Sequence, residues 1–277
     1  MYETFNDGRS IVKLGLELIW GGNIMFEKLA KHVYVYKYDG FTDRPNIGLV
    51  VGSKYALLYD AGNSAAHVEL MKKDLVKQGL PLPDYIVLSH WHWDHSFGAT
   101  FWNVPVIAGR ETNEQLQIVK RWKWDDQSMA DRVTSGDDIV FCNEMIKREY
   151  PDRSKIKVSI ADIVFDGRMT IDLGGVICDL IHSKGPHASD SVICHVPSDG
   201  FLFLGDSNCK DLYGLPWHFD IEHEEDFKKN TDALPYDSAK VKEFLRLMDT
   251  LDFTMCISGH SKAKSKEALY AAMLEEC

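Results

Sequence analysis

The sequence predicts an α/β fold in which helices cover the outer faces of packed β-sheets. Two β-rich halves, each accompanied by segments of helical spacing, support this prediction. Several short apolar segments are also followed by a glycine and then by a residue able to bind a metal ion. A chain of 277 residues can bury a large core, and α/β folds of this size often remain undivided, so we expect one domain over residues 1–277.

The first half is predicted to be β-structure around one long helix. Apolar patterns place strands at residues 32–38, 46–51, 55–59, 85–89 and 104–108. Residues 64–78 have helical spacing, and Gly79 is suited to end that helix. The inner face of the helix is expected to consist of Val68, Met71, Leu75 and Val76.

The middle of the chain, near residues 110–152, is predicted to be a helical insertion. Residues 111–121 form one expected helix, and a second helical pattern occurs near 137–149. Trp122 and Trp124 lie between the two. Aromatic side chains belong to a core more often than to a site, so packing within the insertion is favoured over a lid that covers a pocket.

The second half returns to β-structure. Strands are predicted at residues 156–165, 169–173, 175–181, 190–196, 201–204 and 253–257. Asp199-Gly200 is expected to form a hairpin turn. A long loop is expected after residue 206, and helices are expected over 237–250 and 263–276.

The composition excludes several classes of partner. The formal net charge of −11 disfavours nucleic acid, which needs clustered Lys and Arg, and an anionic membrane surface. No stretch is long and apolar enough to span a bilayer, and residues 1–4 lack the start of a secretory signal. The six cysteines include no Cys-x-x-Cys pair. We therefore expect a cytoplasmic protein whose partner is a small-molecule substrate, and the sequence predicts no particular oligomeric state.

The most informative motif is the segment 90–95, His-Trp-His-Trp-Asp-His, which follows the apolar run 85–88. In an extended segment, residues i and i+2 face the same side, so His90 and His92 can share one metal ion. Asp94 and His95 lie further round the turn and face a different point. Imidazoles and carboxylates on a rigid base are zinc ligands. The spacing therefore predicts two metal sites side by side, with a metal-free polar loop as the weaker alternative.

Three more potential ligands occur where α/β folds usually build their sites, after the ends of strands. His187, Asp206 and His260 each follow a predicted strand and a glycine. Each is weak evidence alone, because a Gly-Asp pair is usually a turn. Together with the 90–95 motif, they supply seven ligands.

With these residues the sequence resembles metallo-β-lactamase-fold hydrolases, and the resemblance covers nearly the whole chain. The family's motifs correspond to Asp60 in the segment 59–62, to the segment 90–95, and to His187, Asp206 and His260. The resemblance implies a four-layer αβ/βα sandwich with the site at the edge of the sheets. It also implies that Asp60 is no ligand but supports the metal loop, as outer-shell carboxylates do.

The resemblance further implies how the ligands are divided. The first metal would be held by His90, His92 and His187, the second by Asp94, His95 and His260, and Asp206 would bridge both. Two Zn²⁺ ions suit this set, with iron or manganese as alternatives. Two ions roughly 3.5–4 Å apart can share a hydroxide that attacks a carbonyl or a phosphorus atom. Asp94 is then expected to orient this nucleophile and to carry a proton.

Departures from the patterns of relatives narrow the substrate by exclusion. Asp206 stands where some zinc β-lactamases have Cys, and none of the early histidines is missing. His92 stands where diiron oxidoreductases have Glu. Only a short tail follows His260, unlike glyoxalase II-type thioesterases with their C-terminal helical domain, and the extra domain or basic arm of nucleases is not visible.

The leading hypothesis is a dinuclear zinc-dependent hydrolase that uses a metal-bridging hydroxide on a small acyl compound such as a lactone, ester or thioester. One alternative is a phosphodiesterase with the same metal centre. Another is a non-catalytic metal-containing binding or sensor protein, which the intact ligand set argues against.

Substrate contacts are expected from residues around the metal motif and the loop after residue 206. Tyr213 could donate a hydrogen bond to a developing oxyanion and is the second candidate catalytic residue. Lys210 and Trp217 lie in the same loop. Either Trp91 or Trp93 faces the pocket or both pack beneath the motif, and the sequence supports the two arrangements equally.

Overall fold

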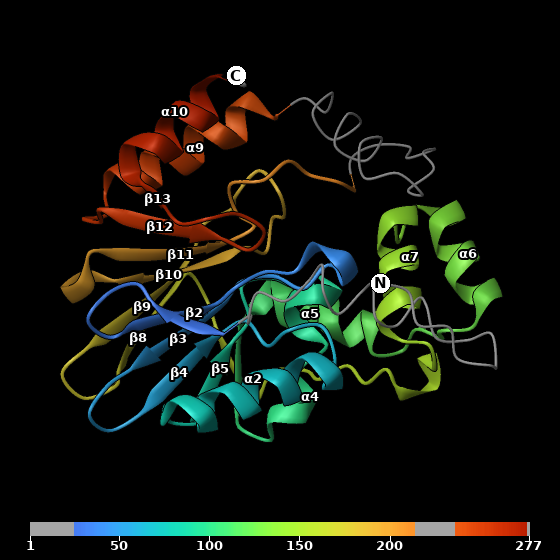
Figure 1. Ribbon diagram of the computed structural model, residues 1–277. Helices are drawn as coiled ribbons and strands as arrows, with labels where there is room; N and C mark the ends of the chain where they lie inside the picture. Colours follow the sequence, from blue (N-terminus) through green and yellow to red (C-terminus); the bar gives the residue numbers. More distant parts are fainter. Residues whose placement is uncertain (1–24, 214–235, 276–277) are drawn as a thin grey trace, which may run out of the picture.

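The computed structural model describes residues 25–213 and 236–275. This part of the chain forms two β-sheets that lie face to face, with helices on their outer sides (Figure 1). The predicted sandwich is confirmed, and its layers follow the order helices, sheet, sheet, helices. No helix within the described ranges is long and apolar enough to cross a membrane.

The first sheet contains seven strands in chain order, β1 to β7. They are β1 (Phe26–Lys28), β2 (Val33–Tyr36), β3 (Ile47–Val51), β4 (Ala56–Tyr59), β5 (Tyr85–Val87), β6 (Val106–Gly109) and β7 (Ile163–Phe165). The pairs from β1 to β4 are antiparallel, and the pairs from β4 to β7 are parallel. Parallel pairs need long crossovers, which α2 (Ala65–Gln78), the segment 88–105 and the helical insertion provide.

The second sheet has the order β13-β12-β11-β10-β9-β8. Its strands are β8 (Arg168–Asp172), β9 (Ile177–His182), β10 (Val192–Val196), β11 (Phe201–Gly205), β12 (Met255–Ser258) and β13 (Lys264–Ser265). The turn predicted at 199–200 joins β10 to β11: the 3₁₀ helix η3 (Pro197–Asp199) is followed by Gly200 in the left-handed region. Only the pair β11–β12 is parallel.

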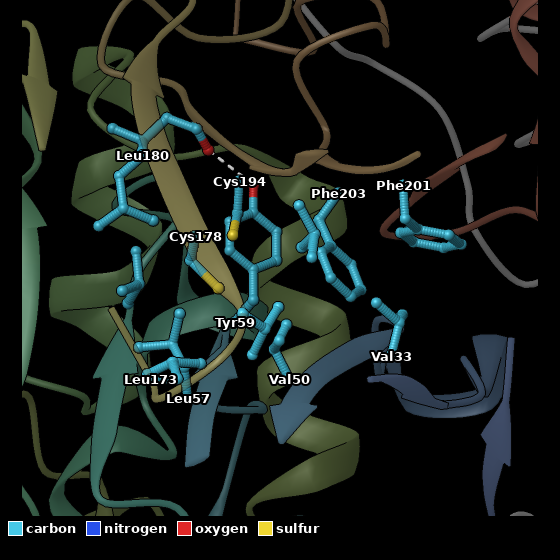
Figure 2. Packing of buried hydrophobic residues seen from close by; sticks show 14 of the residues in the cluster. Val33, Val50, Leu57, Tyr59, Leu173, Cys178, Leu180, Cys194, Phe201 and Phe203 are labelled. Atoms are coloured by element: carbon cyan, nitrogen blue, oxygen red, sulfur yellow. Dashed lines mark hydrogen bonds between the residues drawn. The ribbon is translucent and has the colours of Figure 1, made fainter. Parts of the chain in front are cut away.

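The main core lies between the two sheets and joins them tightly. Tyr59 of β4 is buried against Phe203 of β11, with ring centroids 5.4 Å apart. Figure 2 shows Tyr59 surrounded by Cys178, Cys194 and other apolar side chains of this cluster. The Tyr59 hydroxyl donates a 2.6 Å hydrogen bond to the carbonyl of Val192. The two sheets are therefore fixed relative to each other, and this also fixes the relative positions of the loops at their shared edge.

Helices cover both outer faces. The first sheet packs against α2 (Ala65–Gln78), α4 (Ala99–Trp102) and α5 (Arg110–Val119), and the second against α9 (Ser238–Asp249) and α10 (Lys266–Glu275) (Figure 1). Ser64 caps α2, and Gly79 ends it at a φ of 68°, as predicted. The expected inner position of Val76 is wrong: its side chain is 73% exposed, because the buried stripe follows positions 68, 71 and 75.

The chain between β6 and β7 contains α5, α6 (Asp126–Ser135), α7 (Val140–Glu149) and the short 3₁₀ helix η2 (Arg153–Lys155). The strand predicted over 156–165 is shorter than expected, because only residues 163–165 pair with β6. Ile156 packs instead into the apolar cluster of α6 and α7. Asp162 accepts a hydrogen bond from the backbone of Val106, which holds this stretch beside the sheet without a regular ladder.

Candidate metal centre

The segment 90–95 changes from extended chain to helix within the motif. His92 has extended backbone angles (φ −55°, ψ 146°) and precedes the short helix α3 (Trp93–Ser96), which contains Asp94 and His95. The extended part directs His90 and His92 toward the same point, where Nε2 of His90 lies 2.9 Å from Nδ1 of His92. Local backbone geometry thus divides the motif into two pairs, as the spacing predicts.

His187, from the loop between β9 and β10, joins the first pair. Its Nε2 lies 3.0 Å from Nδ1 of His92, and its Nδ1 lies 2.7 Å from the carbonyl oxygen of Lys210. Because a carbonyl only accepts, Nδ1 carries the proton and Nε2 presents a lone pair to the other rings. Ligand nitrogens of His90, His92 and His187 lie within 4.8 Å of one another, and we call these residues the histidine group.

The second cluster combines two imidazoles with two carboxylates. Asp94, His95, Asp206 and His260 offer ligand atoms within 4.8 Å of one another, and we call these residues the mixed group. Oδ2 of Asp94 lies 3.0 Å from Nε2 of His95 and 3.1 Å from Nε2 of His260. Oδ2 of Asp206 lies 3.5 Å from each of the same two nitrogens.

Asp206 is the carboxylate of the mixed group that also approaches the histidine group. Its Oδ2 lies 3.8 Å from Nε2 of His187. Asp206 directly follows β11, whose last residue, Gly205, has a φ of +53°. A side chain at Gly205 would also collide with Ser89, because its Cβ would lie 2.6 Å from the Ser89 Cβ. This glycine therefore lets Asp206 reach a position between the two groups.

The donor set fits divalent metal ions. Oδ1 of Asp206 is buried and makes no hydrogen bond within the described part of the chain, and Nε2 of His95 faces the carboxylates of Asp94 and Asp206. Buried polar atoms in proteins are nearly always paired, so such orphan atoms need an explanation. Imidazole nitrogens and carboxylate oxygens are donors for zinc, iron and manganese. Two convergent donor groups, with an unpaired carboxylate oxygen between them, indicate a site suited to divalent metals.

The histidine group is electrostatically prepared to act as a neutral ligand set. Burial, reinforced by the imidazoles of His95 and His187, lowers the pKa of His90 well below its usual value. Burial and the neighbouring His90 and His187 do the same to the pKa of His92. His90 and His92 are therefore neutral at neutral pH and need lose no proton before they bind an ion.

The mixed group has the opposite character. Burial alone would lower the pKa of His260, but the carboxylates of Asp206, Asp43 and Asp94 raise it to about 9. Burial is likewise outweighed at His95, where Asp94 and other nearby carboxylates raise the pKa well above its usual value. The imidazoles in turn hold the pKa of Asp206 well below its usual range despite burial. A metal bound here would displace protons from the two histidines.

Asp60 supports the metal loop from behind. It follows β4 in the left-handed region, with a φ of +66°, and its side chain is buried. Its Oδ1 accepts a 2.7 Å hydrogen bond from the backbone N–H of Ser89, and its Oδ2 lies 2.7 Å from Nδ1 of His95. Asp60 is not the cap of α2, because Ser64 takes that role. The carboxylate thus orients one member of the mixed group without joining it.

Two further supporting residues were not predicted. The Ser89 hydroxyl lies 2.9 Å from Nδ1 of His90, which leaves Nε2 of that ring to face the histidine group. Asp190 is buried, which raises its pKa to about 6, and its Oδ2 accepts a 2.9 Å hydrogen bond from the backbone of Trp91. Their positions in the sequence could have indicated this role, because Ser89 immediately precedes the motif and Asp190 follows shortly after His187.

Tyr213 lies beside the histidine group, but its hydroxyl is already engaged. The ring stacks on His92, with centroids 4.9 Å apart and planes 27° from parallel. The hydroxyl lies 3.3 Å from Oδ1 of Asp138, to which it donates, and 3.5 Å from Sγ of Cys142. The expected oxyanion donor is therefore placed as an aromatic neighbour whose polar end is bound to the helical insertion.

The other residues predicted to contact the substrate lie in different environments. Trp91 is partly exposed and lies edge-on to His92, with ring centroids 4.7 Å apart. Trp93 is only 3% exposed and packs in the apolar cluster of the insertion, so the structure does not place it at an accessible surface. The Lys210 ammonium lies 5.3 Å from the centre of the Tyr236 ring. Trp217 lies outside the described residues.

Trp122 and Trp124 pack within the insertion, as the favoured interpretation expects. Both rings contact the guanidinium of Arg132, whose central carbon lies 4.5 Å and 4.8 Å from the two ring centres. Trp122 also meets Trp91 edge-on, with centroids 6.2 Å apart. The insertion therefore continues the aromatic surface that begins at Trp91.

Comparison with solved structures finds the same fold at low sequence identity. The DIM-1 metallo-beta-lactamase matches with a TM-score of 0.57 and 16% identity, over 90% of this chain and 94% of its own. A metallo-beta-lactamase from Pontibacter korlensis matches with a TM-score of 0.56 and 17% identity, over 90% and 96%. A double mutant of the sec-alkyl sulfatase PisA1 matches with a TM-score of 0.59 and 13% identity, over 91% of this chain but 40% of its own.

No curated protein sequence matches the chain. The sequence profile of the metallo-beta-lactamase superfamily matches residues 41–260, well over half of the chain. This range contains both donor groups and the supporting Asp60. The chain therefore belongs to the metallo-β-lactamase superfamily.

Proposed function

We propose that this protein is a dinuclear metal-dependent hydrolase that acts on a small acyl compound of the lactone, ester or thioester type. In this proposal the histidine group holds one ion, the mixed group holds the other, and Asp206 bridges them. Zinc is the proposed metal, because the donors are imidazoles and carboxylates.

The observation that carries this proposal is the position of Asp206. Its Oδ2 lies within 3.8 Å of nitrogens from both groups, and its Oδ1 is a buried acceptor without a hydrogen bond in the described chain. One carboxylate between two donor sets is suited to bridging two metal ions. Two such ions lower the pKa of water toward neutrality and polarise the substrate oxygen.

Asp94 is the proposed proton carrier. The imidazoles of His95 and His260 outweigh burial and hold its pKa well below the usual range, so the carboxylate is ionised at neutral pH. An ionised carboxylate can accept a hydrogen bond from a nucleophile and orient it, which is the first part of the proposed role. The Asp94 side chain is also mostly buried, which limits the water that competes for it.

The substrate's apolar part is proposed to lie against an aromatic wall formed by Trp91, Trp122 and Tyr213. Trp91 lies between the other two, with ring centroids 6.2 Å from Trp122 and 5.4 Å from Tyr213, and it also touches His92. All three rings are partly exposed. Aromatic surfaces with a few polar groups are typical of small-molecule sites. Lys210 and Trp217 remain proposed contacts from the loop after Asp206.

The net charge supports a small substrate over a polyanion. At −11, the chain repels nucleic acid and anionic lipid over long range. Two metal ions could offset a single phosphate, so a phosphodiesterase is the second outcome to test. A cytoplasmic location also belongs to this proposal.

The first test is the metal content of the purified protein. We expect close to two transition-metal ions per chain after expression in zinc-supplemented medium, measured by elemental analysis. Only trace metal under these conditions would overturn the two-metal proposal.

The second test compares substrates directly. A lactone, a thioester, a β-lactam, a nitrophenyl phosphodiester and RNA are assayed side by side with the metal-loaded protein. We expect the highest kcat/KM for an acyl substrate and no turnover of RNA. A phosphodiester hydrolysed much faster than every acyl substrate would make the phosphodiesterase the better assignment, and no turnover of any activated substrate would favour a binding or sensor protein.

A further inference from the structure

His260 is the least enclosed member of the mixed group. Its side chain is 29% exposed, whereas those of Asp94, His95 and Asp206 are at most 9% exposed. It also lies beyond the end of β12, near the edge of the second sheet, where the next strand, β13, has only two residues. Side-chain packing therefore restrains His260 less than its partners, and its position depends on how its backbone loop is held.

One anchor of this loop comes from its own sheet. The backbone N–H of Gly259 donates a 2.8 Å hydrogen bond to the carbonyl of Gly205, at the end of β11. A Cβ at Gly259 would lie 2.4 Å from Oδ1 of Asp206 and 2.8 Å from Cε1 of His95. The loop thus passes so close to the mixed group that only glycine fits, and any displacement would change the geometry of the donors.

The second anchor comes from the other sheet, through Asn46 immediately before β3. Its Nδ2 donates to the carbonyls of Ser258 and Ser261, each at 2.7 Å. Its backbone N–H donates to the carbonyl of Gly259 at 2.6 Å. These three carbonyls lie on both sides of His260, so one residue holds the loop before and after the ligand.

Asn46 is itself rigidly held. Its side chain is buried, with 6% exposure, and its Oδ1 accepts a 2.9 Å hydrogen bond from the backbone of Tyr38. Both Nδ2 protons, the Oδ1 acceptor and the backbone N–H therefore have partners. The orientation of the amide is fixed as well, because Nδ2 must face the two carbonyls and Oδ1 must face an N–H.

We infer that Asn46 is the positioning residue that places His260 in the mixed group, and that it thereby controls occupancy of the second metal site. This inference rests on the metal centre proposed above. Aspartate at this position would be nearly isosteric but would turn a carboxylate oxygen toward the carbonyls of Ser258 and Ser261. Serine would remove both hydrogen bonds that Nδ2 donates, without adding a charge.

The test is metal binding by Asn46→Asp and Asn46→Ser, measured by Co²⁺ titration followed by visible absorption and by elemental analysis after dialysis. We expect the wild type to bind two ions. In both variants one ion should bind as in the wild type. The affinity for the other ion should fall roughly 10–100-fold, which is the usual loss when a residue that orients a metal ligand is mutated. If Asn46→Asp does not fold, Asn46→Ser gives the same comparison.

Asn143 provides the matched control. It is buried in α7 with 5% exposure, and its Nδ2 donates a 3.0 Å hydrogen bond to the carbonyl of Met129, within the insertion. Asn143→Asp and Asn143→Ser make the same chemical changes against a backbone carbonyl of the insertion, which is not part of the His260 loop. We expect these variants to lose stability yet to bind both ions with wild-type affinity.

Three results would overturn the inference, and they are distinguishable. Asn46 variants that bind the second ion as the wild type does would show that the loop needs no such anchor. An equal loss in the Asn143 variants would show that general destabilisation is the cause. A wild-type protein that binds fewer than two ions would refute the metal centre itself, and the positioning role with it.

Discussion

The histidine group and the mixed group lie side by side, yet they differ in charge and in how they are held. The histidine group contains no carboxylate, and burial together with mutual repulsion keeps His90 and His92 neutral. The mixed group pairs two carboxylates with two imidazoles whose pKa values are raised. The first group is therefore ready to accept an ion, whereas the second already balances charge internally and must release protons to bind one.

A neighbouring residue of each group shows a second difference. Behind the mixed group stands the ionisable side chain of Asp60, 2.7 Å from Nδ1 of His95. Beside the histidine group stands the ring of Tyr213, whose hydroxyl reaches Asp138 in the insertion. A direct hydrogen bond to a ligand orients it, whereas a stacked ring mainly excludes water. Loss of the Asp60 carboxylate should therefore affect metal binding more than loss of the Tyr213 hydroxyl.

The largest effect on metal content and activity is expected from a change at Asp206, which approaches both groups. Asp206→Ala removes the carboxylate that approaches both, so it should lower metal content toward one ion or fewer per chain and abolish hydrolysis. Elemental analysis and an activity assay on the same preparation measure this. The control is Asp166→Ala, which removes an exposed carboxylate paired with Arg110. Two tightly bound ions in the Asp206 variant would refute its bridging role.

Asp60→Ala should have the next largest effect. Loss of its hydrogen bonds to His95 and Ser89 should reduce metal affinity or kcat/KM roughly 10–100-fold. The loss should fall on the mixed group, so a Co²⁺ titration should show one weakened ion and one unchanged ion.

Ser64→Ala is the control for Asp60, because Ser64 caps α2 four residues further along. It should cost about 1 kcal/mol of stability and leave activity normal. Activity in Asp60→Ala equal to that of the control would mean that Asp60 has only a structural role.

The distribution of the ligands along the chain explains which parts of the site could be predicted from the sequence. The pairs within the segment 90–95 follow from local backbone periodicity, so they could be recognised without knowledge of the fold. The more distant ligands could be recognised as candidates by their positions after strand ends, but only the resemblance to a family assigned each of them to a metal site. The contacts of Asn46 and Ser89 were not predicted, because a buried Asn or Ser has no periodic pattern that names its partner.

The strand that is shorter than predicted has a similar physical cause. Periodicity indicates that a segment is buried but not by what, so the apolar stretch beginning at Ile156 was predicted as strand although it packs against the insertion. The substrate roles predicted for Trp93, which belongs to the motif, and for Tyr213, which lies beside it, stay predictions. Burial of Trp93 and the Asp138 hydrogen bond of Tyr213 decide which of their atoms remain accessible. Such outcomes depend on packing between remote segments.

A smaller effect, on stability, is expected from Asp138→Asn beside the histidine group. Burial raises the pKa of Asp138 to about 6, although Arg132 and hydrogen bonds oppose the shift. In the unfolded chain this carboxyl titrates at about pH 4. Between these values the folded state binds more protons, so wild-type stability falls as the pH rises from about 4 to 6.

Asparagine does not titrate, so the stability of Asp138→Asn relative to the wild type should increase over that window, by on the order of 2 kcal/mol. Denaturant unfolding of both metal-free proteins at pH 4 and pH 7 measures it. Groups shared by the two proteins cancel in the difference. A difference in stability that does not change with pH would contradict the raised pKa.

The smallest effect is expected from Tyr213→Phe, which keeps the ring on His92 and removes only the hydroxyl. The hydrogen bond to Asp138 is long, at 3.3 Å, so its loss should cost no more than about 1 kcal/mol of stability. Metal content should not change, and kcat should change by less than about 3-fold. If the hydroxyl instead turned toward the substrate and stabilised an oxyanion, its loss would lower kcat by about 10²–10³-fold with little effect on stability. Steady-state kinetics and thermal melting of this one variant therefore distinguish a tyrosine that supports the histidine group from one that takes part in the reaction.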